Sequence, residues 1–264
     1  MSPSLIALDL DGTLLRSDAT LSPRSAKAIR DLRAEKIQIV LCTGRPPRYT
    51  ESLARELNLE ACAVVYNGAS ICDFRAGTAE HLHQLSGATA RAVITKLRDA
   101  RPGVLTGLET VHGWYLDSEL YEQRKAVLKR RNLPLPDGAG DMLDFLDAGA
   151  IKILVRHPEL AAPLLAEALR DLDVYATWSS ESLLEVQHPK TNKRTALEHL
   201  CDKLGLEPSS VAAFGDQNND VEMLSWAGTG VAVANAAPEA KRAADLITLS
   251  NDKDGVAALL ETWL

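Results

Sequence analysis

Residues 5–15 read LIALDLDGTLL, and the remainder of the chain is best interpreted from this stretch. Two carboxylates, Asp9 and Asp11, interrupt an apolar run and are followed at once by Gly12 and Thr13. Burying an ionised carboxylate is costly unless something pairs with it. The run therefore predicts a short buried strand that ends at a turn, and its two carboxylates require a partner there.

Strand and helix signals alternate after this stretch. Residues 37–44 and 62–68 are short apolar runs that end in polar turns, and helical patterns at residues 23–35 and 48–59 precede them. Ser22 is a plausible N-cap, with proline at the next position. The same alternation returns from Lys193 to the C-terminus. Buried strands that alternate with helices predict a parallel sheet covered on both faces.

The middle of the chain follows another pattern. Strand pairs at residues 103–117 and 173–187 read as hairpins, and helical patterns at residues 88–100 and 158–172 precede them. Residues 132–150 read as loop and residues 151–156 as a strand. Hairpins mixed with helices indicate an α+β layer. The sequence thus predicts a doubly wound, Rossmann-like α/β core from residues 1–82 plus 189–264, and an inserted α+β domain over residues 83–188.

Composition narrows the function classes. The chain has 264 residues, 46% of them hydrophobic and 25% charged, with a net charge of −7. This balance disfavours a general nucleic-acid binder. We find no apolar run near the ~20 residues of a membrane span and no signal-peptide pattern. The four cysteines form no metal-binding cluster. We therefore expect a cytoplasmic protein without nucleic-acid or membrane partners, as a monomer or small homo-oligomer.

Polar residues follow four strands of the predicted core. Carboxyl ends of parallel strands meet at one edge of a sheet, so these residues should form one site. They are Asp9, Asp11 and Thr13; Thr43, Gly44 and Arg45; Asn67 and Gly68; and Asp216, Asn219 and Asp220.

This set of residues suits phosphoryl transfer. Mg²⁺ is commonly held by one or two carboxylates plus substrate phosphate, and Asp9 and Asp216 can provide them. A cation also explains how several acids can share one site. Thr43 offers a hydroxyl donor and Lys193 a positive charge, while glycines allow backbone amides to approach an anion.

These motifs, in this order, resemble those of haloacid dehalogenase-like hydrolases. The matching stretches are DLDGT (residues 9–13), TGR (43–45), the lysine at 193 and GDQNND (215–220). YNGA (66–69), NA (235–236) and SNDKDGV (250–256) are similar to the Cof-type sugar-phosphatase branch. The motif matches come from both ends of the chain.

The resemblance implies a role for each residue. Asp9 would be the nucleophile that forms an aspartyl-phosphate, and Asp11 the general acid and base. Asp9, Asp216, Asp220 and the main-chain carbonyl of Asp11 would surround Mg²⁺. The resemblance further implies that the insertion is a cap that closes over the substrate and sets specificity. Phosphate and substrate binding is assigned to Leu10, Gly12, Thr43, Gly44, Arg45, Asn67, Lys193 and Asn219.

Two assignments leave alternatives open. Arg194 follows the motif lysine, where the family usually has glycine, and Lys190 competes with Lys193 for that role. Arg45 either contacts substrate or forms a salt bridge to the insertion.

The favoured function is a Mg²⁺-dependent phosphatase of a small phosphorylated metabolite, such as a sugar phosphate, nucleotide or cofactor phosphate. A sugar phosphomutase of the same superfamily and a catalytically silent phosphate-binding protein are the alternatives. A signalling receiver domain is disfavoured because its phosphorylated aspartate lies mid-chain, with its lysine last. The first turn also lacks the GxGxxG pattern of dinucleotide-binding enzymes.

Overall fold

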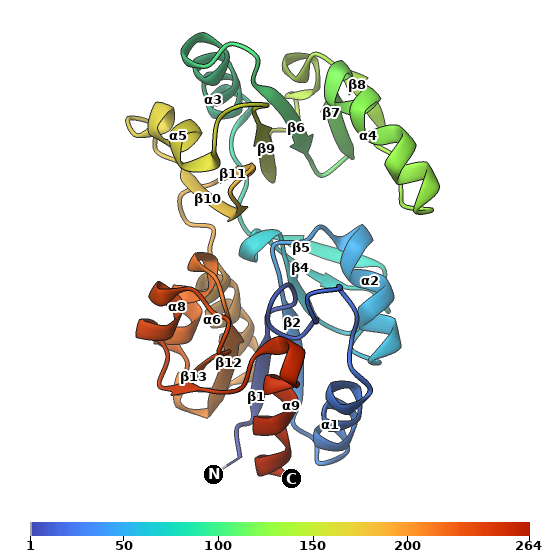
Figure 1. The fold of residues 1–264 in the computed structure, drawn as a ribbon, viewed down its shortest axis with the longest axis vertical. Helices are drawn as coiled ribbons and strands as arrows, with labels where there is room; N and C mark the ends of the chain where they lie inside the picture. The colour runs from blue at the N-terminus through green and yellow to red at the C-terminus, as the bar shows by residue number, and fades with distance from the viewer. Residues whose placement is uncertain (1) are drawn as a thin grey trace. The chain divides into compact units, whose positions relative to one another are not determined.

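The computed structural model describes residues 2–264 and divides into two compact units (Figure 1). The core unit comprises the chain up to Leu82 together with Asn192–Leu264, and the insertion unit is His83–Thr191. Residues 189–191, which we expected in the core, cluster with the insertion unit. Within residues 2–264, no helix combines the length and the apolar character that a membrane crossing requires.

The core unit is built on a sheet that has eight strands within the described residues, in the order β14-β13-β12-β1-β2-β3-β4-β5. The strands from β14 to β3 run parallel, and β4 and β5 add an antiparallel hairpin. The strand bounds are β1 (Leu5–Leu8), β2 (Gln38–Cys42), β3 (Ala63–Val65), β4 (Ser70–Asp73), β5 (Thr78–His81), β12 (Val211–Gly215), β13 (Thr229–Ala232) and β14 (Leu246–Ile247).

Register brings the motif-bearing ends of the central strands together. The last residue of β1, Leu8, pairs with Leu41 of β2 on one side and with Phe214 of β12 on the other. All three side chains are fully buried. The polar residues that follow each strand therefore emerge next to one another at a single edge of the sheet.

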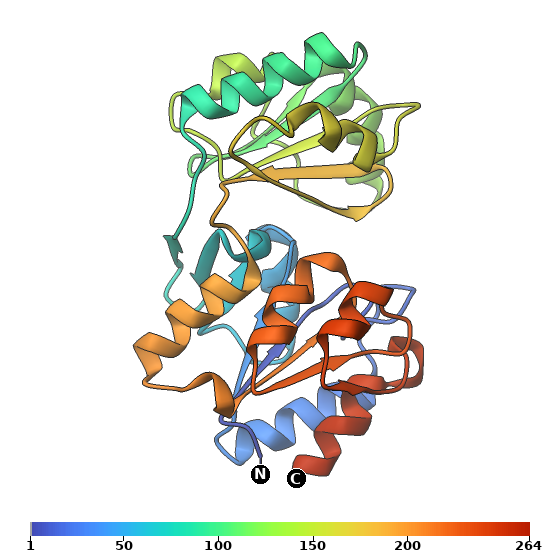
Figure 2. The same cartoon turned by 90° about the vertical axis from the view of Figure 1, so that its left-hand side faces the viewer.

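Helices cover this sheet on both faces because successive parallel strands run outward in opposite directions, from β1 to β3 on one side and from β12 to β14 on the other. Helix α1 packs on α9, while α6 and α8 both pack on α7 (Figure 2). Ser22 caps the N-terminus of helix α1, and its side chain accepts from the Ser25 amide, as the N-cap pattern predicts. The helix bounds are α1 (Pro23–Ala34), α2 (Pro47–Glu56), α6 (Lys193–Leu204), α7 (Val221–Trp226), α8 (Pro238–Ala243) and α9 (Gly255–Leu260).

The insertion unit has its own sheet, in the order β10-β11-β9-β6-β7-β8. Neighbouring strands are antiparallel except for the pair β7 and β8. The elements are α3 (Gly87–Ala100), β6 (Leu105–Glu109), β7 (Trp114–Asp117), α4 (Ser118–Arg130), β8 (Gly138–Gly140), β9 (Lys152–Arg156), α5 (Ala162–Ala166), β10 (Tyr175–Ser180) and β11 (Leu183–Gln187).

One sequence expectation in this unit needs correction. Residues 132–150, expected as loop, contain β8 and a 3₁₀ turn at Met142–Phe145. Strand β8 reads Gly-Ala-Gly, so it has almost no side-chain pattern from which a strand could be recognised. It forms because the edge of β7 offers unpaired backbone groups. The strand therefore depends on tertiary pairing and not on its own side chains.

Candidate active site

The site begins where the central strands end. The amide of Asp9 donates to the Phe214 carbonyl at 3.1 Å and the amide of Thr43 donates to the Val64 carbonyl at 2.9 Å, so each ladder continues one residue past its strand. These bonds fix the backbone at the first functional side chain of each segment. The backbone at Asp9 and Thr43 is therefore held by the same kind of ladder bond as the strands.

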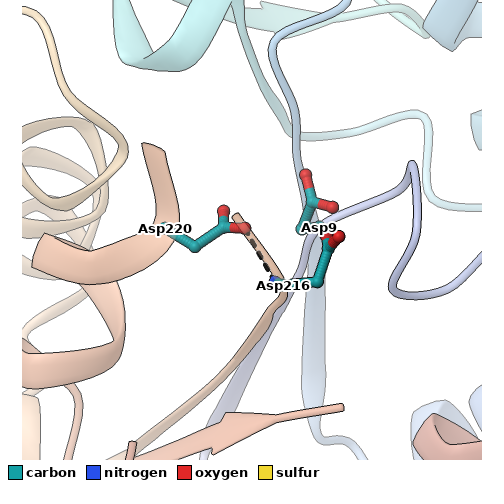
Figure 3. A group of neighbouring side chains, drawn as sticks. All are labelled: Asp9, Asp216 and Asp220. Atoms are coloured by element: carbon teal, nitrogen blue, oxygen red, sulfur yellow. Dashed lines mark hydrogen bonds between the residues drawn. The ribbon is translucent and has the colours of Figure 1, made fainter. Parts of the chain in front are cut away.

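Three carboxylates meet at this edge. Asp9 follows β1, Asp216 follows β12, and Asp220 ends the 3₁₀ turn Asn218–Asp220 (Figure 3). One oxygen of each lies within 4.8 Å of the others. All three residues are buried, with exposed fractions of 5%, 2% and 0%. This spacing of hard oxygen donors suits a divalent cation.

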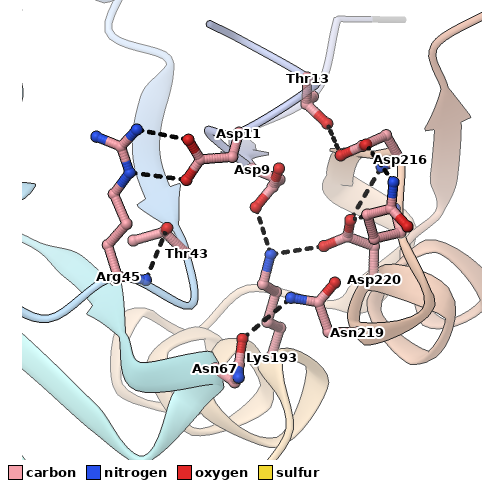
Figure 4. A network of polar contacts seen from close by, with 11 residues as sticks. Asp9, Asp11, Thr13, Thr43, Arg45, Asn67, Lys193, Asp216, Asn219 and Asp220 are labelled. Carbon is pink, nitrogen blue, oxygen red and sulfur yellow. Dashed lines mark hydrogen bonds and ion pairs between the residues drawn. The ribbon is translucent and has the colours of Figure 1, made fainter. Parts of the chain in front are cut away.

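Lys193 is the cation of this cluster. Its Nζ donates to Asp9 Oδ1 at 2.5 Å and to Asp220 Oδ1 at 2.6 Å, and the side chain is completely buried (Figure 4). It is the first residue of α6, whose N-cap Asn192 accepts from the Thr195 amide at 2.8 Å. The capped helix start thus directs the lysine between two carboxylates from different segments.

Asp220 accepts three hydrogen bonds within the protein. Its Oδ2 accepts from the Asp216 amide at 2.9 Å and from the Gln217 amide at 3.0 Å, while its Oδ1 accepts from Lys193. The carboxylate therefore shapes the turn after β12 and orients the lysine. Of the three carboxylates, it has the least capacity left for an ion.

Asp216 is held from both sides. Thr13 Oγ1 donates to its Oδ1 at 2.9 Å, and Gln217 Nε2 donates to its Oδ2 at 3.0 Å. Gly12 has a φ of +85°, and a Cβ added there would lie 2.4 Å from Asp216 Oδ2. The glycine of the opening motif is therefore required twice, for its backbone conformation and for the close approach of this carboxylate.

The buried charges do not balance. Asp9, Asp216 and Asp220 carry three negative charges against the one positive charge of Lys193, which leaves a formal surplus of two. Burial raises the pKa of Asp9 well above its ordinary value, and the carboxylates of Asp220 and Asp216 add to this against the opposing effect of Lys193. Burial and the Asp220 charge raise the pKa of Asp216 to about 6. Burial alone would lower the pKa of Lys193, but the two carboxylates outweigh it and raise that pKa. A divalent cation would supply the two missing charges, so these residues fit Mg²⁺.

Asp11 lies apart from this cluster and pairs with Arg45. Arg45 Nε donates to Asp11 Oδ2 at 2.7 Å and Nη2 donates to Oδ1 at 2.5 Å (Figure 4). The Asp11 side chain is 58% exposed, whereas the carboxylates of the cluster are buried. We expected Arg45 either to contact substrate or to form a salt bridge to the insertion. Its pairing with Asp11 was not among these expectations. Asp9 and Asp11, two residues apart, thus differ in environment: Asp9 is buried beside Lys193, and Asp11 is exposed beside Arg45.

Thr43 and the amide side chains complete the edge. The Arg45 amide donates to Thr43 Oγ1 at 3.1 Å, which leaves the hydroxyl hydrogen to point elsewhere. Asn219 Nδ2 donates to Asn67 Oδ1 at 3.0 Å, and the Asn67 amide donates to the Thr43 carbonyl at 3.0 Å. A Cβ on Gly44 would lie 2.7 Å from Asn67 Oδ1, so this loop too is closely packed. Asn67 has a φ of 56°, a conformation that asparagine tolerates better than most residues.

The structure separates the two lysines proposed for the motif. Lys193 lies in the cluster, whereas Lys190 is exposed in the segment before α6. Arg194, at the usual glycine position, donates to Glu198 Oε1 at 2.8 Å on the exposed side of α6. The departure from the family pattern therefore falls outside the cluster.

Some residues at this edge had no assigned role. Thr13 and Gln217 bind Asp216, and Asn235 Nδ2 donates to the Gly12 carbonyl at 2.8 Å. Asn251 donates from its amide to Asn235 Oδ1 at 3.0 Å and from Nδ2 to the Leu15 carbonyl at 3.0 Å. Asn235 follows β13 and Asn251 follows β14, so the strand-end rule that selected the other residues would also have found these two.

Comparison with known proteins gives a consistent result. The family model of haloacid dehalogenase-like hydrolases matches residues 6–260. The chain is 28% identical to the 5-amino-6-(5-phospho-D-ribitylamino)uracil phosphatase YitU of Bacillus subtilis, covering 99% of this chain and 97% of that protein. It is 31% identical to the putative phosphatase YxeH of the same organism, with 96% and 95% covered. A solved haloacid dehalogenase-like hydrolase from Bacteroides thetaiotaomicron superposes with a TM-score of 0.82 at 28% identity, covering 98% of this chain and 99% of that one.

The family match covers nearly the whole chain, and the four motif segments meet at one edge of the core sheet. The chain belongs to the haloacid dehalogenase-like hydrolases and is a phosphoric monoester hydrolase of the Cof-type branch.

Proposed function

We propose that this protein hydrolyses the phosphate monoester of a small metabolite through an aspartyl-phosphate on Asp9. The observation that carries the proposal is the surplus of two negative charges in a buried cluster beside Lys193. Such a surplus is unfavourable for stability alone. It is suited to hold a divalent cation and, with it, a phosphate dianion.

Asp9 and Asp216 would hold Mg²⁺, with the main-chain carbonyl of Asp11 as a further ligand. When bound, the ion supplies positive charge that stabilises the phosphoryl oxygens. Asp220, whose two oxygens already bond within the protein, would serve mainly to orient Lys193.

In the first step, an oxygen of Asp9 attacks phosphorus while Asp11 gives a proton to the leaving oxygen, and the bond from phosphorus to that oxygen breaks. Thr43, through its available hydroxyl hydrogen, and Lys193 would hold the phosphoryl oxygens. In the second step, Asp11 takes a proton from water as the water oxygen attacks phosphorus. The bond between phosphorus and the Asp9 oxygen breaks, its electron pair returns to the Asp9 carboxylate, and phosphate leaves.

We assign substrate selection to the insertion unit, as a cap of this family would imply. The relative YitU is named for a phosphorylated ribitylaminouracil, which is the size of ligand we propose here. The four cysteines are all free thiols, which supports a reducing, cytoplasmic compartment.

The test is a phosphate-release screen over phosphorylated sugars, nucleotides and cofactors, with and without Mg²⁺. Wild-type protein should release phosphate only with the metal, and Asp9→Asn should release none. Asp31→Asn removes a carboxylate that pairs with Lys27 on α1, outside the site, and should keep the full rate. Transfer of phosphate to a second sugar hydroxyl without release would instead indicate a mutase.

A further inference from the structure

We propose that Arg45 is a positioning residue that fixes Asp11 for the hydrolysis of the phosphorylated intermediate. The inference rests on the proposed function above and deepens it. It starts from the ion pair between Arg45 and Asp11, which the motif pattern did not anticipate.

The pair has the geometry of a clamp. Arg45 donates from Nε to one oxygen of Asp11 and from Nη2 to the other, at 2.7 and 2.5 Å. Two parallel bonds fix the plane of the carboxylate, which a single bond would leave free to rotate. The Asp11 side chain is 58% exposed, so without the clamp it could adopt other rotamers at little cost.

The clamp is anchored to the site through its backbone. The Arg45 amide donates to Thr43 Oγ1 at 3.1 Å, and the Arg45 carbonyl accepts from the Tyr66 amide at 3.1 Å. Arg45 is thus tied to the loops after β2 and β3 on both sides of its Cα. A guanidinium that starts from a fixed backbone can place the carboxylate reproducibly.

The two carboxylates of the opening motif face different cations. Asp9 points towards Lys193, and Asp11 turns the other way towards Arg45 (Figure 4). Arg45 therefore acts on the proton-transferring carboxylate, whereas Lys193 holds the nucleophile.

Fixing Asp11 should matter most in the second step. In the first step, the rest of the substrate holds the leaving oxygen in place. In the second step, the attacking water has no binding groups of its own, so its orientation depends on the carboxylate that accepts its proton. A loosened Asp11 should therefore slow hydrolysis of the intermediate more than its formation.

The experiment uses p-nitrophenyl phosphate, whose leaving group departs without a proton from Asp11. The fraction of enzyme carrying phosphate at steady state is measured by acid quench, together with kcat, in wild type, Arg45→Gln and Arg45→Lys. We expect the hydrolysis rate of the phosphoenzyme to fall about ten- to hundredfold in Arg45→Gln, with a higher phosphorylated fraction. Arg45→Lys keeps the positive charge but loses the two parallel donors of the guanidinium. Its phosphoenzyme should hydrolyse at a rate between those of wild type and Arg45→Gln. Arg55→Gln, which removes a surface pair with Glu51 on α2, should match wild type.

A double-mutant cycle gives the decisive readout. If Arg45 acts through Asp11, Arg45→Gln should have no further effect in an Asp11→Asn background. If the two substitutions instead reduce the hydrolysis rate additively, the inference is overturned. It is also overturned if Arg45→Gln raises KM and leaves the phosphorylated fraction unchanged, because Arg45 would then bind substrate. Full-rate turnover by Asp9→Asn would overturn the proposed function itself, and this inference with it. Should Arg45→Gln fold poorly, the same comparison is made with Arg45→Lys.

Discussion

Replacing Asp216 with asparagine should stabilise the metal-free protein while it abolishes phosphatase activity. Burial and the neighbouring Asp220 raise the pKa of Asp216 from 3.8 to about 6. A difference of this size corresponds to about 3 kcal/mol at pH values above 6. That free energy opposes folding, because the ionised carboxylate is less favourable in the folded state than in the unfolded chain.

The Asp216→Asn substitution cannot recover all of this unfavourable free energy. Its carbonyl oxygen can still accept the bond from Thr13, which now spans 2.9 Å, but its amide cannot accept the bond from Gln217. A lost hydrogen bond costs about 1 kcal/mol, and a bond to a charged group is stronger than a bond to a neutral one. We therefore expect a net gain of about 1–2 kcal/mol, or roughly 2–8 °C in Tm.

The assay is differential scanning calorimetry of both proteins with EDTA at pH 8 and pH 5. The folded pKa of Asp216 lies above its unfolded value, so the destabilisation is present above pH 6 and is relieved as the pH falls through 6. The Asp216→Asn advantage should therefore be largest at pH 8 and smaller at pH 5. Adding Mg²⁺ at pH 8 should raise the Tm of wild type and leave the variant nearly unchanged. A variant less stable than wild type at pH 8 in EDTA would refute the reasoning.

Three further outcomes follow from the same geometry. Lys193→Met leaves two buried carboxylates without their cation and should cost about 3–5 kcal/mol in urea unfolding; a loss below about 1 kcal/mol would contradict the charge assignment. Gly12→Ala should weaken Mg²⁺ binding in calorimetric titration at least about tenfold, because its Cβ would displace Asp216; unchanged affinity would remove Asp216 from the metal site. The affinity of wild type for Mg²⁺ should fall about tenfold per pH unit below 6, as Asp216 gains a proton, and a flat profile from pH 7 to 5 would contradict this.

Much of the fold was predictable because its signals are local. The apolar runs at β1, β2 and β12 are buried on both faces, so they appear in the sequence as continuous hydrophobic stretches. Helix α1 begins with a serine N-cap and a proline at the first turn, both of which can be read directly. Strand β8 has no such signal, because its existence depends on the exposed edge of β7.

The site was predictable to the level of segments but not of contacts. The strand-end rule brings Asp9, Thr43 and Asp216 together, because parallel topology leaves no other arrangement. It gives no information on rotamers, so the pairing of Arg45 with Asp11 could not be inferred from spacing. Side-chain pairing depends on which cation reaches which carboxylate across separate loops, and this is decided only in three dimensions.

The central claim is that Asp9 becomes phosphorylated during turnover. The direct measurement is mass spectrometry of enzyme incubated with p-nitrophenyl phosphate and Mg²⁺, quenched in acid and digested at low pH. We predict one phosphoryl group on the peptide that contains Asp9, absent from Asp9→Asn and increased in Asp11→Asn. Phosphate on a different residue, or full-rate hydrolysis by Asp9→Asn, would contradict the claim.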